Sequence, residues 1–284
     1  MRTIRETIAE GTAVLQRSES DSETPFLDAL VLLSHTLDIS KEKLLASYPD
    51  RIEEAYFNSF IDLIAKRSRN YPVSYLIEKK EFYGLPFYVN ENVLVPRPDS
   101  ETLVSNALNI IEIFPDKNSI LDLCTGSGAL GIALKYTLPN LQVVCSDISP
   151  GALEVCRRNS KSILGSDIDT VESNLFDKIN GEFDIIITNP PYLTDRETSD
   201  MMKKGCKEPS ISLKGGRDGL DFIRIIIGKA PGFLKKEGYL LIESSIDQTG
   251  RIAEMMASEN YCNIRIVEDL SGRNRVTLGQ RGLK

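Results

Sequence analysis

The 284-residue sequence contains no tryptophan, a single histidine and five cysteines without a CxxC pair. Protein sites for zinc and related metals are built from clusters of histidine, cysteine and acidic residues. With so few histidine and cysteine ligands, we expect no bound metal. An odd number of cysteines also argues against a complete disulfide framework, so we expect buried free thiols in a reducing compartment.

Long hydrophobic runs are also missing. No stretch approaches the ~20 apolar residues that a membrane span requires. The opening segment, MRTIRETIAEG, contains two glutamates and no hydrophobic block, which is not typical of a targeting signal. Hydrophobic residues make up 41% of the chain and charged residues 26%, as in globular proteins. We therefore expect a cytoplasmic protein without a membrane partner.

An excess of basic residues is absent as well. The sequence has 34 lysines and arginines against 41 acidic residues, a formal net charge of −7. A general polyanion binder needs a basic face to displace counterions from the phosphates. The charge therefore argues against a direct nucleic-acid partner, although Lys203, Lys204 and Lys207 could form a local basic patch.

The pattern of apolar residues divides the chain into three parts. Residues 1–70 have apolar positions at helical spacing, and no glycine occurs between Gly11 and Gly84. This predicts a small helical domain. Residues 71–95 alternate aromatic and apolar positions, which predicts a β-hairpin linker. Residues 96–284 form the third and largest part.

The third part predicts a doubly wound α/β fold. Asp99 or Ser100 is expected to cap a helix that runs to about Ile113. From 119 to 188, short apolar strands alternate with helical segments, which indicates a mostly parallel sheet covered on both faces. Ligands of such sheets bind at the carboxyl ends of the strands. A polar segment at 194–218 interrupts this pattern.

A glycine-rich turn lies between the first strand and helix of this sheet, in the sequence DLCTGSGALG at 122–131. Its glycines permit a tight turn, and the following helix N-terminus supplies partial positive charge. Asp147 follows Gly126 by 21 residues, at the end of the second strand. An acid in that place can bind both hydroxyls of a ribose.

Two cofactors agree with this turn. GSGALG satisfies the GxGxxG pattern of nicotinamide enzymes. Asp122, however, would repel a pyrophosphate and attract the ammonium of S-adenosylmethionine, so the sequence favours S-adenosylmethionine over NAD. Asn174 could bond the adenine edge and Leu175 or Phe176 could cover its face, although a plain loop is nearly as consistent with these residues.

The sequence NPPY at 189–192 ends a short β-branched strand. Proline lacks an N–H and cannot continue a sheet, so a stiff corner is expected there. The Asn189 side-chain oxygen and the Pro190 carbonyl could accept both hydrogens of a planar NH2 group, and Tyr192 could stack on its π system. Without such a ligand, the same residues would form only a proline-rich turn. We take Asn189, Pro190, Pro191 and Tyr192 as the candidate catalytic and substrate-binding residues.

Taken together, these motifs resemble the HemK/PrmC family of protein-(glutamine-N5) methyltransferases, and the resemblance covers essentially the whole chain. NPPY and the glycine loop are shared by many amino-methyltransferases, whereas the PRPDSE and EP…GGRDGLDF segments are more particular to this family. The matching segments are VPRPDSE (95–101), DLCTGSGALG (122–131), SDISPGAL (146–153), NPPY (189–192), EPSISLKGGRDGLDF (208–222), IESSIDQ (242–248) and DLSGRNR (269–275).

The resemblance implies methyl transfer from S-adenosylmethionine to the glutamine of the GGQ motif in class-1 peptide-chain release factors, which modulates translation termination. It implies a seven-stranded, Rossmann-like methyltransferase domain at 96–284, and an N-terminal domain that docks the release factor. A monomer is expected. The cofactor residues it implies, with Asp147 at the ribose and Asn174 and Leu175 at the adenine, are Thr125, Gly126, Ser127, Gly128, Asp147, Asn174 and Leu175; the target glutamine is implied to lie against Asn189, Pro190, Pro191 and Tyr192.

Three positions depart from the family pattern. Cys124 stands where the loop usually has glycine, Leu175 where tryptophan is frequent, and Asn174 where aspartate often occurs. Three other functions stay open: an adenine-N6 nucleic-acid methyltransferase with the same NPPY grip, a non-catalytic scaffold, and an NAD enzyme.

Overall fold

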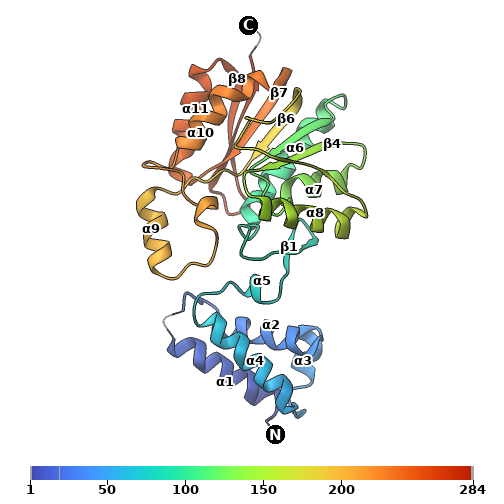
Figure 1. Cartoon of the computed structure of the whole chain (residues 1–284), viewed down its shortest axis with the longest axis vertical. Coiled ribbons are helices and arrows are strands. Elements are labelled where there is room, and N and C mark those ends of the chain that lie inside the picture. The colour runs from blue at the N-terminus through green and yellow to red at the C-terminus, as the bar shows by residue number, and fades with distance from the viewer. Residues whose placement is uncertain (1, 19, 283–284) are drawn as a thin grey trace. The chain divides into compact units, whose positions relative to one another are not determined.

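The computed structural model describes residues 2–18 and 20–282 (Figure 1). Contacts between residues divide the chain into two compact units. The first runs to Lys79 and also includes residues 201–207, and the second comprises 80–200 with the chain from Glu208 onward. The domain boundaries expected from the sequence stay a prediction.

The first unit is helical, and its helices enclose a core of their own. Gly11 lies where α1 crosses α4, since a Cβ there would lie 2.5 Å from Cζ of Phe60. Arg67, also buried, forms ion pairs with Asp28 at 2.7 Å and Asp21 at 2.6 Å. The helices are α1 (Ile4–Arg17), α2 (Pro25–Leu37), α3 (Lys41–Ala46), α4 (Glu54–Arg67) and α5 (Val73–Leu76).

A short segment from the second half of the chain completes this unit. Residues 201–207 contain the end of α9 (Asp195–Lys203). The Asn70 side chain donates a hydrogen bond to the Lys204 carbonyl at 2.5 Å, and the Lys207 ammonium lies 5.2 Å from the centre of the Tyr71 ring. The expected polar interruption at 194–218 therefore contains a helix, and part of it contacts the loop between α4 and α5.

The expected hairpin at 71–95 is shorter than predicted. Its strands, β1 (Lys80–Phe82) and β2 (Leu85–Phe87), are joined by Tyr83 and Gly84, both at positive φ. Residues 73–76 are helical instead, with Pro72 as the N-cap. Proline suits that position because the N–H it lacks would have no intrahelical acceptor there. Aromatic alternation alone does not distinguish such a turn from a strand.

The second unit is built on a seven-stranded sheet in the order β5-β4-β3-β6-β7-β9-β8, which confirms the predicted fold class. The first five of these strands are parallel, and β9 and β8 continue the sheet antiparallel. The strands are β3 (Ser119–Leu123), β4 (Gln142–Asp147), β5 (Asp169–Glu172), β6 (Phe183–Thr188), β7 (Leu234–Glu243), β8 (Tyr261–Glu268) and β9 (Asn274–Arg281).

Helices cover both faces of this sheet (Figure 1). On one face lie α6 (Glu101–Ile113), α7 (Ala129–Thr137) and α8 (Pro150–Leu164), and on the other α10 (Asp221–Lys229) and α11 (Thr249–Ser258). Each layer has an apolar core against the sheet. Within the described ranges, no helix is long and apolar enough to cross a membrane.

Two local expectations are confirmed only in part. Ser100 is the N-cap residue of α6, which ends at Ile113 as expected, but its side chain makes no capping hydrogen bond. A 3-10 turn, η1 (Pro98–Ser100), precedes the helix, and the Ser100 hydroxyl accepts a hydrogen bond from Asn189. The cysteines are free thiols, but they are not all buried, because Cys262 is exposed whereas Cys145 and Cys156 are enclosed.

Candidate active site

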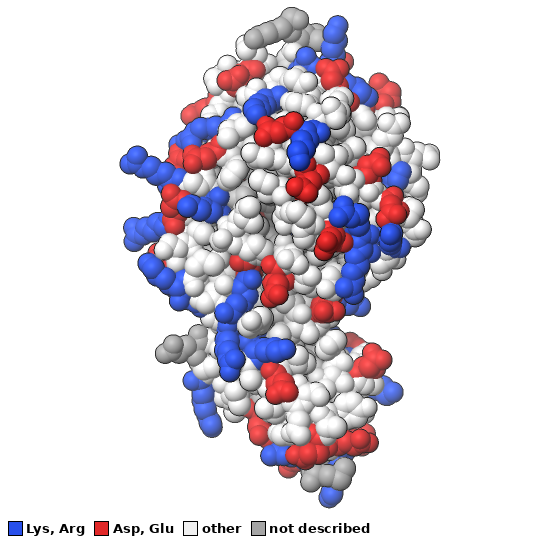
Figure 2. Space-filling view, viewed as in Figure 1, with Lys and Arg blue, Asp and Glu red and all other residues white. Residues whose placement is uncertain are grey.

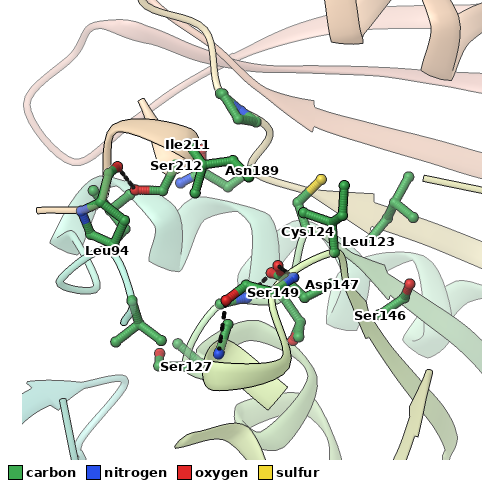
Figure 3. A pocket seen from close by; sticks show the side chains of 18 of the residues that line it. Leu94, Leu123, Cys124, Ser127, Ser146, Asp147, Ser149, Asn189, Ile211 and Ser212 are labelled. Carbon is green, nitrogen blue, oxygen red and sulfur yellow. Dashed lines mark hydrogen bonds between the residues drawn. The ribbon is translucent and has the colours of Figure 1, made fainter. Parts of the chain in front are cut away.

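A pocket opens at the carboxyl ends of β3, β4 and β6, where the parallel sheet predicts a ligand site. It encloses about 1090 Å³, including solvent at its mouth. Figure 3 shows Asp147, Ser149 and Ser127 on one side, and Asn189, Ile211 and Ser212 on the other. The glycine loop and the strand that ends in NPPY thus line one cavity.

The glycine loop forms part of the pocket wall. Gly126 has φ of +55°, and a Cβ placed on it would meet no atom within 4 Å, so a ligand can approach this backbone closely. At Gly128, with φ of +82°, a Cβ would lie 2.7 Å from the sulfur of Cys156, so a side chain there would push the loop from α8. Cys124 also lines the pocket with a positive φ of +61°.

Asp122 lies beneath the loop rather than in the pocket wall. Its Oδ2 accepts hydrogen bonds from the Thr125 hydroxyl at 2.5 Å and from the Gly131 N–H at 2.9 Å. Its side chain is fully buried, and burial raises its pKa to about 7. In the structure the carboxylate holds the loop on α7. The expected attraction between this carboxylate and a ligand ammonium stays a prediction.

Asp147 lies at the end of β4 and lines the pocket, as expected. One carboxylate oxygen accepts the Gly126 N–H at 2.9 Å and the other accepts the Ser149 N–H at 3.0 Å. Burial raises the pKa of Asp147. The carboxylate thus joins the glycine loop to the loop after β4 and presents an anionic acceptor to the pocket.

Asn174 and Leu175 follow β5 and both line the pocket. The Asn174 side chain is exposed, whereas Leu175 is 8% exposed and packs into the core beneath the pocket. Leu175 adopts φ of +48°, a conformation that few non-glycine residues take. Their predicted contacts with adenine stay a prediction.

Asn189 follows β6 and has a defined side-chain orientation. Its Nδ2 donates to Oε1 of Glu243 at 2.9 Å and to Oγ of Ser100 at 3.1 Å. A carboxamide has two N–H donors and one carbonyl acceptor. With both donors engaged by the protein, the Asn189 oxygen is the atom left to accept a hydrogen bond from a ligand.

The other NPPY residues differ in exposure to the pocket. Pro191 lines it, Pro190 is buried, and Tyr192 is half-buried outside the lining. Burial raises the pKa of the Tyr192 hydroxyl to about 12, so this side chain stays neutral near pH 7. The predicted stacking of Tyr192 on a substrate amide stays a prediction.

The chain after NPPY is braced by a segment to which the sequence assigned no role. The Gly215 N–H donates to the Leu193 carbonyl at 2.7 Å, and Nε2 of Gln248 donates to the Tyr192 carbonyl at 2.9 Å. A Cβ on Gly219 would lie 2.2 Å from the same carbonyl oxygen. Only glycine allows this approach, so the GGRDG segment and Gln248 fix the corner's backbone.

A buried acid, Glu208, holds the segment around Arg97 that forms part of the pocket wall. Glu208, 6% exposed, accepts the Val95 N–H at 3.0 Å and the Arg97 guanidinium at 2.6 Å. Arg97 lines the pocket, as does Ile211, which is 52% exposed. Among the described residues, no cluster of His, Cys, Asp and Glu could hold a metal ion.

Two family models match this chain. A PrmC N-terminal domain matches residues 6–77, and a methyltransferase small domain matches residues 100–208. The first match lies in the N-terminal helical part, and the second contains both the glycine loop and NPPY.

Relatives match over nearly the full chain. A release factor glutamine methyltransferase of Clostridium acetobutylicum is 35% identical, over 98% of this chain and 99% of its own. One of Vibrio cholerae is 36% identical, over 98% and 96%.

A solved structure supports the fold alone. The crystal structure of a methyltransferase from Pyrococcus furiosus superposes with a TM-score of 0.52 and 17% identity, over 72% of this chain and 92% of its own.

Proposed function

The chain belongs to the family of release factor glutamine methyltransferases, and from that membership we propose that it methylates the side-chain nitrogen of the GGQ glutamine in a class-1 release factor. The observation that carries this proposal is the orientation of Asn189, whose two N–H groups are bound by Glu243 and Ser100. The side-chain oxygen is thereby free to grip a planar NH2 group.

The residues of the pocket fit S-adenosylmethionine. The open space over Gly126 allows close approach of a ligand, and the Asp147 carboxylate can accept hydrogen bonds from a ribose diol. Thr125 and Ser127 line the pocket beside Gly126, and Gly128 belongs to the same loop. Asn174 and Leu175, which also line the pocket, would contact the adenine. When bound, this cofactor supplies an electrophilic methyl group on a sulfonium.

The protein's part in the reaction is orientation. A glutamine nitrogen is a poor nucleophile because its lone pair is delocalised into the carbonyl. The Asn189 oxygen and the Pro190 carbonyl would accept its two hydrogens and so align the lone pair. These hydrogen bonds strengthen as the nitrogen gains positive charge, which favours the transition state over the ground state. Orientation of this kind contributes up to about 7–11 kcal/mol.

The direct test is Asn189→Ala in the full-length protein. We expect kcat for methylation of a release factor to fall at least about a hundredfold, as when an oriented active-site hydrogen-bonding group is removed. Binding of S-adenosylmethionine, measured by calorimetry, should change little. Ile266→Ala, on the antiparallel strand β8, is the matched control and should retain activity. Full activity of Asn189→Ala would contradict the proposed grip.

Bulk nucleic acid is the second substrate in the same assay, because adenine also presents a planar NH2 group. Figure 2 shows acidic and basic side chains interspersed over the face it displays. A polyanion binder requires a basic stripe, so we propose a protein substrate without a nucleic-acid partner. We also propose that the enzyme acts as a monomer in the cytoplasm, where the translation machinery supplies its substrate.

A further inference from the structure

A buried acid next to Asn189 has no role in the chemistry described so far. Glu243 ends β7 and is 1% exposed. Its Oε1 accepts from Asn189, whereas Oε2 has no hydrogen-bond partner among the described residues. Burying a carboxylate with an unpaired oxygen destabilises a fold. Its presence therefore suggests a task other than stability.

Geometry indicates what that task is. An asparagine carboxamide can be turned by half a rotation with little change of shape, which exchanges its oxygen and its NH2 group. With Asn189 turned, its oxygen would face the Glu243 carboxylate, and two acceptors would oppose each other. Ser100 provides the second acceptor for the observed orientation. The pair thus favours the orientation that leaves the oxygen free.

We propose that Glu243 and Ser100 are positioning residues that hold the Asn189 oxygen toward the target amide. This inference rests on the proposed function, and it adds that the negative charge of Glu243, relayed through Asn189, favours the positive charge that the target nitrogen gains. Neither residue needs to touch the substrate. Their effect falls on kcat rather than on cofactor affinity.

The surroundings of Glu243 set its response to pH. Hydrogen bonding by Ser100 and Asn189 favours its charged form. Three titratable groups also interact with it electrostatically: Arg275 from β9, Asp99 from η1, and Tyr192 from the corner after β6. Arg275 is itself paired with Asp99 at 3.0 Å and with Asp269 at 3.4 Å. Burial raises the pKa of Glu243 to about 7, which makes it partly protonated at neutral pH. We therefore expect kcat to rise with pH through about 7 as Glu243 ionises.

The test compares variants of the full-length protein acting on an intact class-1 release factor with S-adenosylmethionine. Glu243→Gln keeps the size of the side chain but can also donate to a turned Asn189. We expect its kcat to fall at least about tenfold and its pH step near 7 to vanish, with the dissociation constant for S-adenosylmethionine within about twofold of the native value. Ser100→Ala should lower kcat less and retain the pH step.

Asp184→Asn is the matched control. Asp184 is also buried and hydrogen-bonded, to Ser119 and Lys235, but it lies near the opposite end of β6. We expect this variant to lower the melting temperature and leave kcat and its pH profile unchanged. A Glu243→Gln enzyme with native kcat and a native pH profile would overturn the inference. If the native enzyme fails to methylate the release factor, the proposed function itself is refuted.

Discussion

At the scale of single residues, Cys124 combines a side chain with a backbone conformation that glycine tolerates better. Its φ of +61° costs an L-residue about 1 kcal/mol or more. Because the strain comes from the Cβ, Cys124→Ala retains it and Cys124→Gly removes it. We expect the glycine variant to be more stable than the alanine variant by about 1 kcal/mol in urea unfolding.

The control for this comparison is a residue with ordinary helical geometry. Ala133 is buried within α7, where glycine costs about 1 kcal/mol relative to alanine. Ala133→Gly should therefore destabilise the protein, opposite in sign to the change at Cys124. If Cys124→Gly is less stable than Cys124→Ala, the loop does not store the proposed strain.

Asp122 predicts a pH dependence of stability. Burial raises its pKa from the ordinary value of 3.8 to about 7 in the folded protein. Between these values the folded state holds a proton that the unfolded state has released, so stability from this group is lost as pH rises from about 4 to 7. Asp122→Asn removes this dependence. We expect the stability of this variant relative to the native protein to rise by up to about 4 kcal/mol between pH 4 and pH 8.

Asp218 is the control, because its pKa is shifted in the opposite direction to that of Asp122. Hydrogen bonds from Arg224 and Arg251 lower its pKa, so its contribution is present above the pKa of the unfolded state and lost in acid. The stability difference between Asp218→Asn and the native protein should be greatest at neutral pH and shrink as pH falls. A stability difference between Asp122→Asn and the native protein that is constant with pH would show that Asp122 is charged in the fold.

At the scale of elements, the GGRDG segment (215–219) holds the backbone of the NPPY corner (189–192) in position. Gly219 has φ of +75°, and a Cβ added to it would collide with the Tyr192 carbonyl. Gly228 in α10 has an ordinary φ, and a Cβ added there would meet no atom within 4 Å. We expect Gly219→Ala to lower kcat at least about tenfold by displacing the corner. Gly228→Ala should keep kcat and stabilise the helix by about 0.5–1 kcal/mol. Equal kcat values for the two variants would contradict the bracing role.

The order of strands and helices in the second unit could be predicted because each element has its own signal in the local sequence. Strands such as β3 and β6 are short apolar runs, and each is followed by a turn of glycine or proline. The hairpin was predicted too long because aromatic residues near Tyr75 also suit a helical turn packed on a core. Ser100 is the N-cap residue that the sequence predicted, but its hydroxyl is bound by Asn189, a residue 89 positions away, which the local sequence could not show.

Site residues could be predicted where their position follows from the strand that they end. Asp147 and Asn189 end apolar strands, and their placement at the pocket could be anticipated from that pattern. Glu243 also ends a strand, which was a signal that could have assigned it to the same edge of the sheet. Its bond to Asn189 could not be predicted, because it depends on β6 and β7 being neighbours in register. Gln248 reaches Tyr192 across space in the same way.

At the scale of the whole molecule, the N-terminal unit bears on whether the enzyme recognises the intact release factor or only its GGQ segment. Phe26 and Leu27, on the first turn of α2, are 49% and 46% exposed. Adjacent exposed apolar side chains often mark contact surfaces. If this unit docks the release factor, an isolated GGQ peptide should have kcat/KM at least about a hundredfold lower than the intact factor. Equal values would show that the unit has no docking role.

A substitution separates docking from chemistry. Phe26→Ser should raise KM for the intact release factor about five- to thirtyfold, which corresponds to about 1–2 kcal/mol of lost contact, and leave kcat for the peptide unchanged. Leu270→Ser is the control, because Leu270 is 96% exposed on the loop before β9 in the other unit. If both substitutions change KM equally, the effect belongs to general surface hydrophobicity.

The most direct measurement is tandem mass spectrometry of an intact class-1 release factor after incubation with this protein and S-adenosylmethionine, with Asn189→Ala in parallel. We predict one methyl group on the side-chain nitrogen of the GGQ glutamine with the native protein, and none with the variant. An unmodified glutamine, a methyl group at another residue, or equal methylation by both proteins would contradict the account.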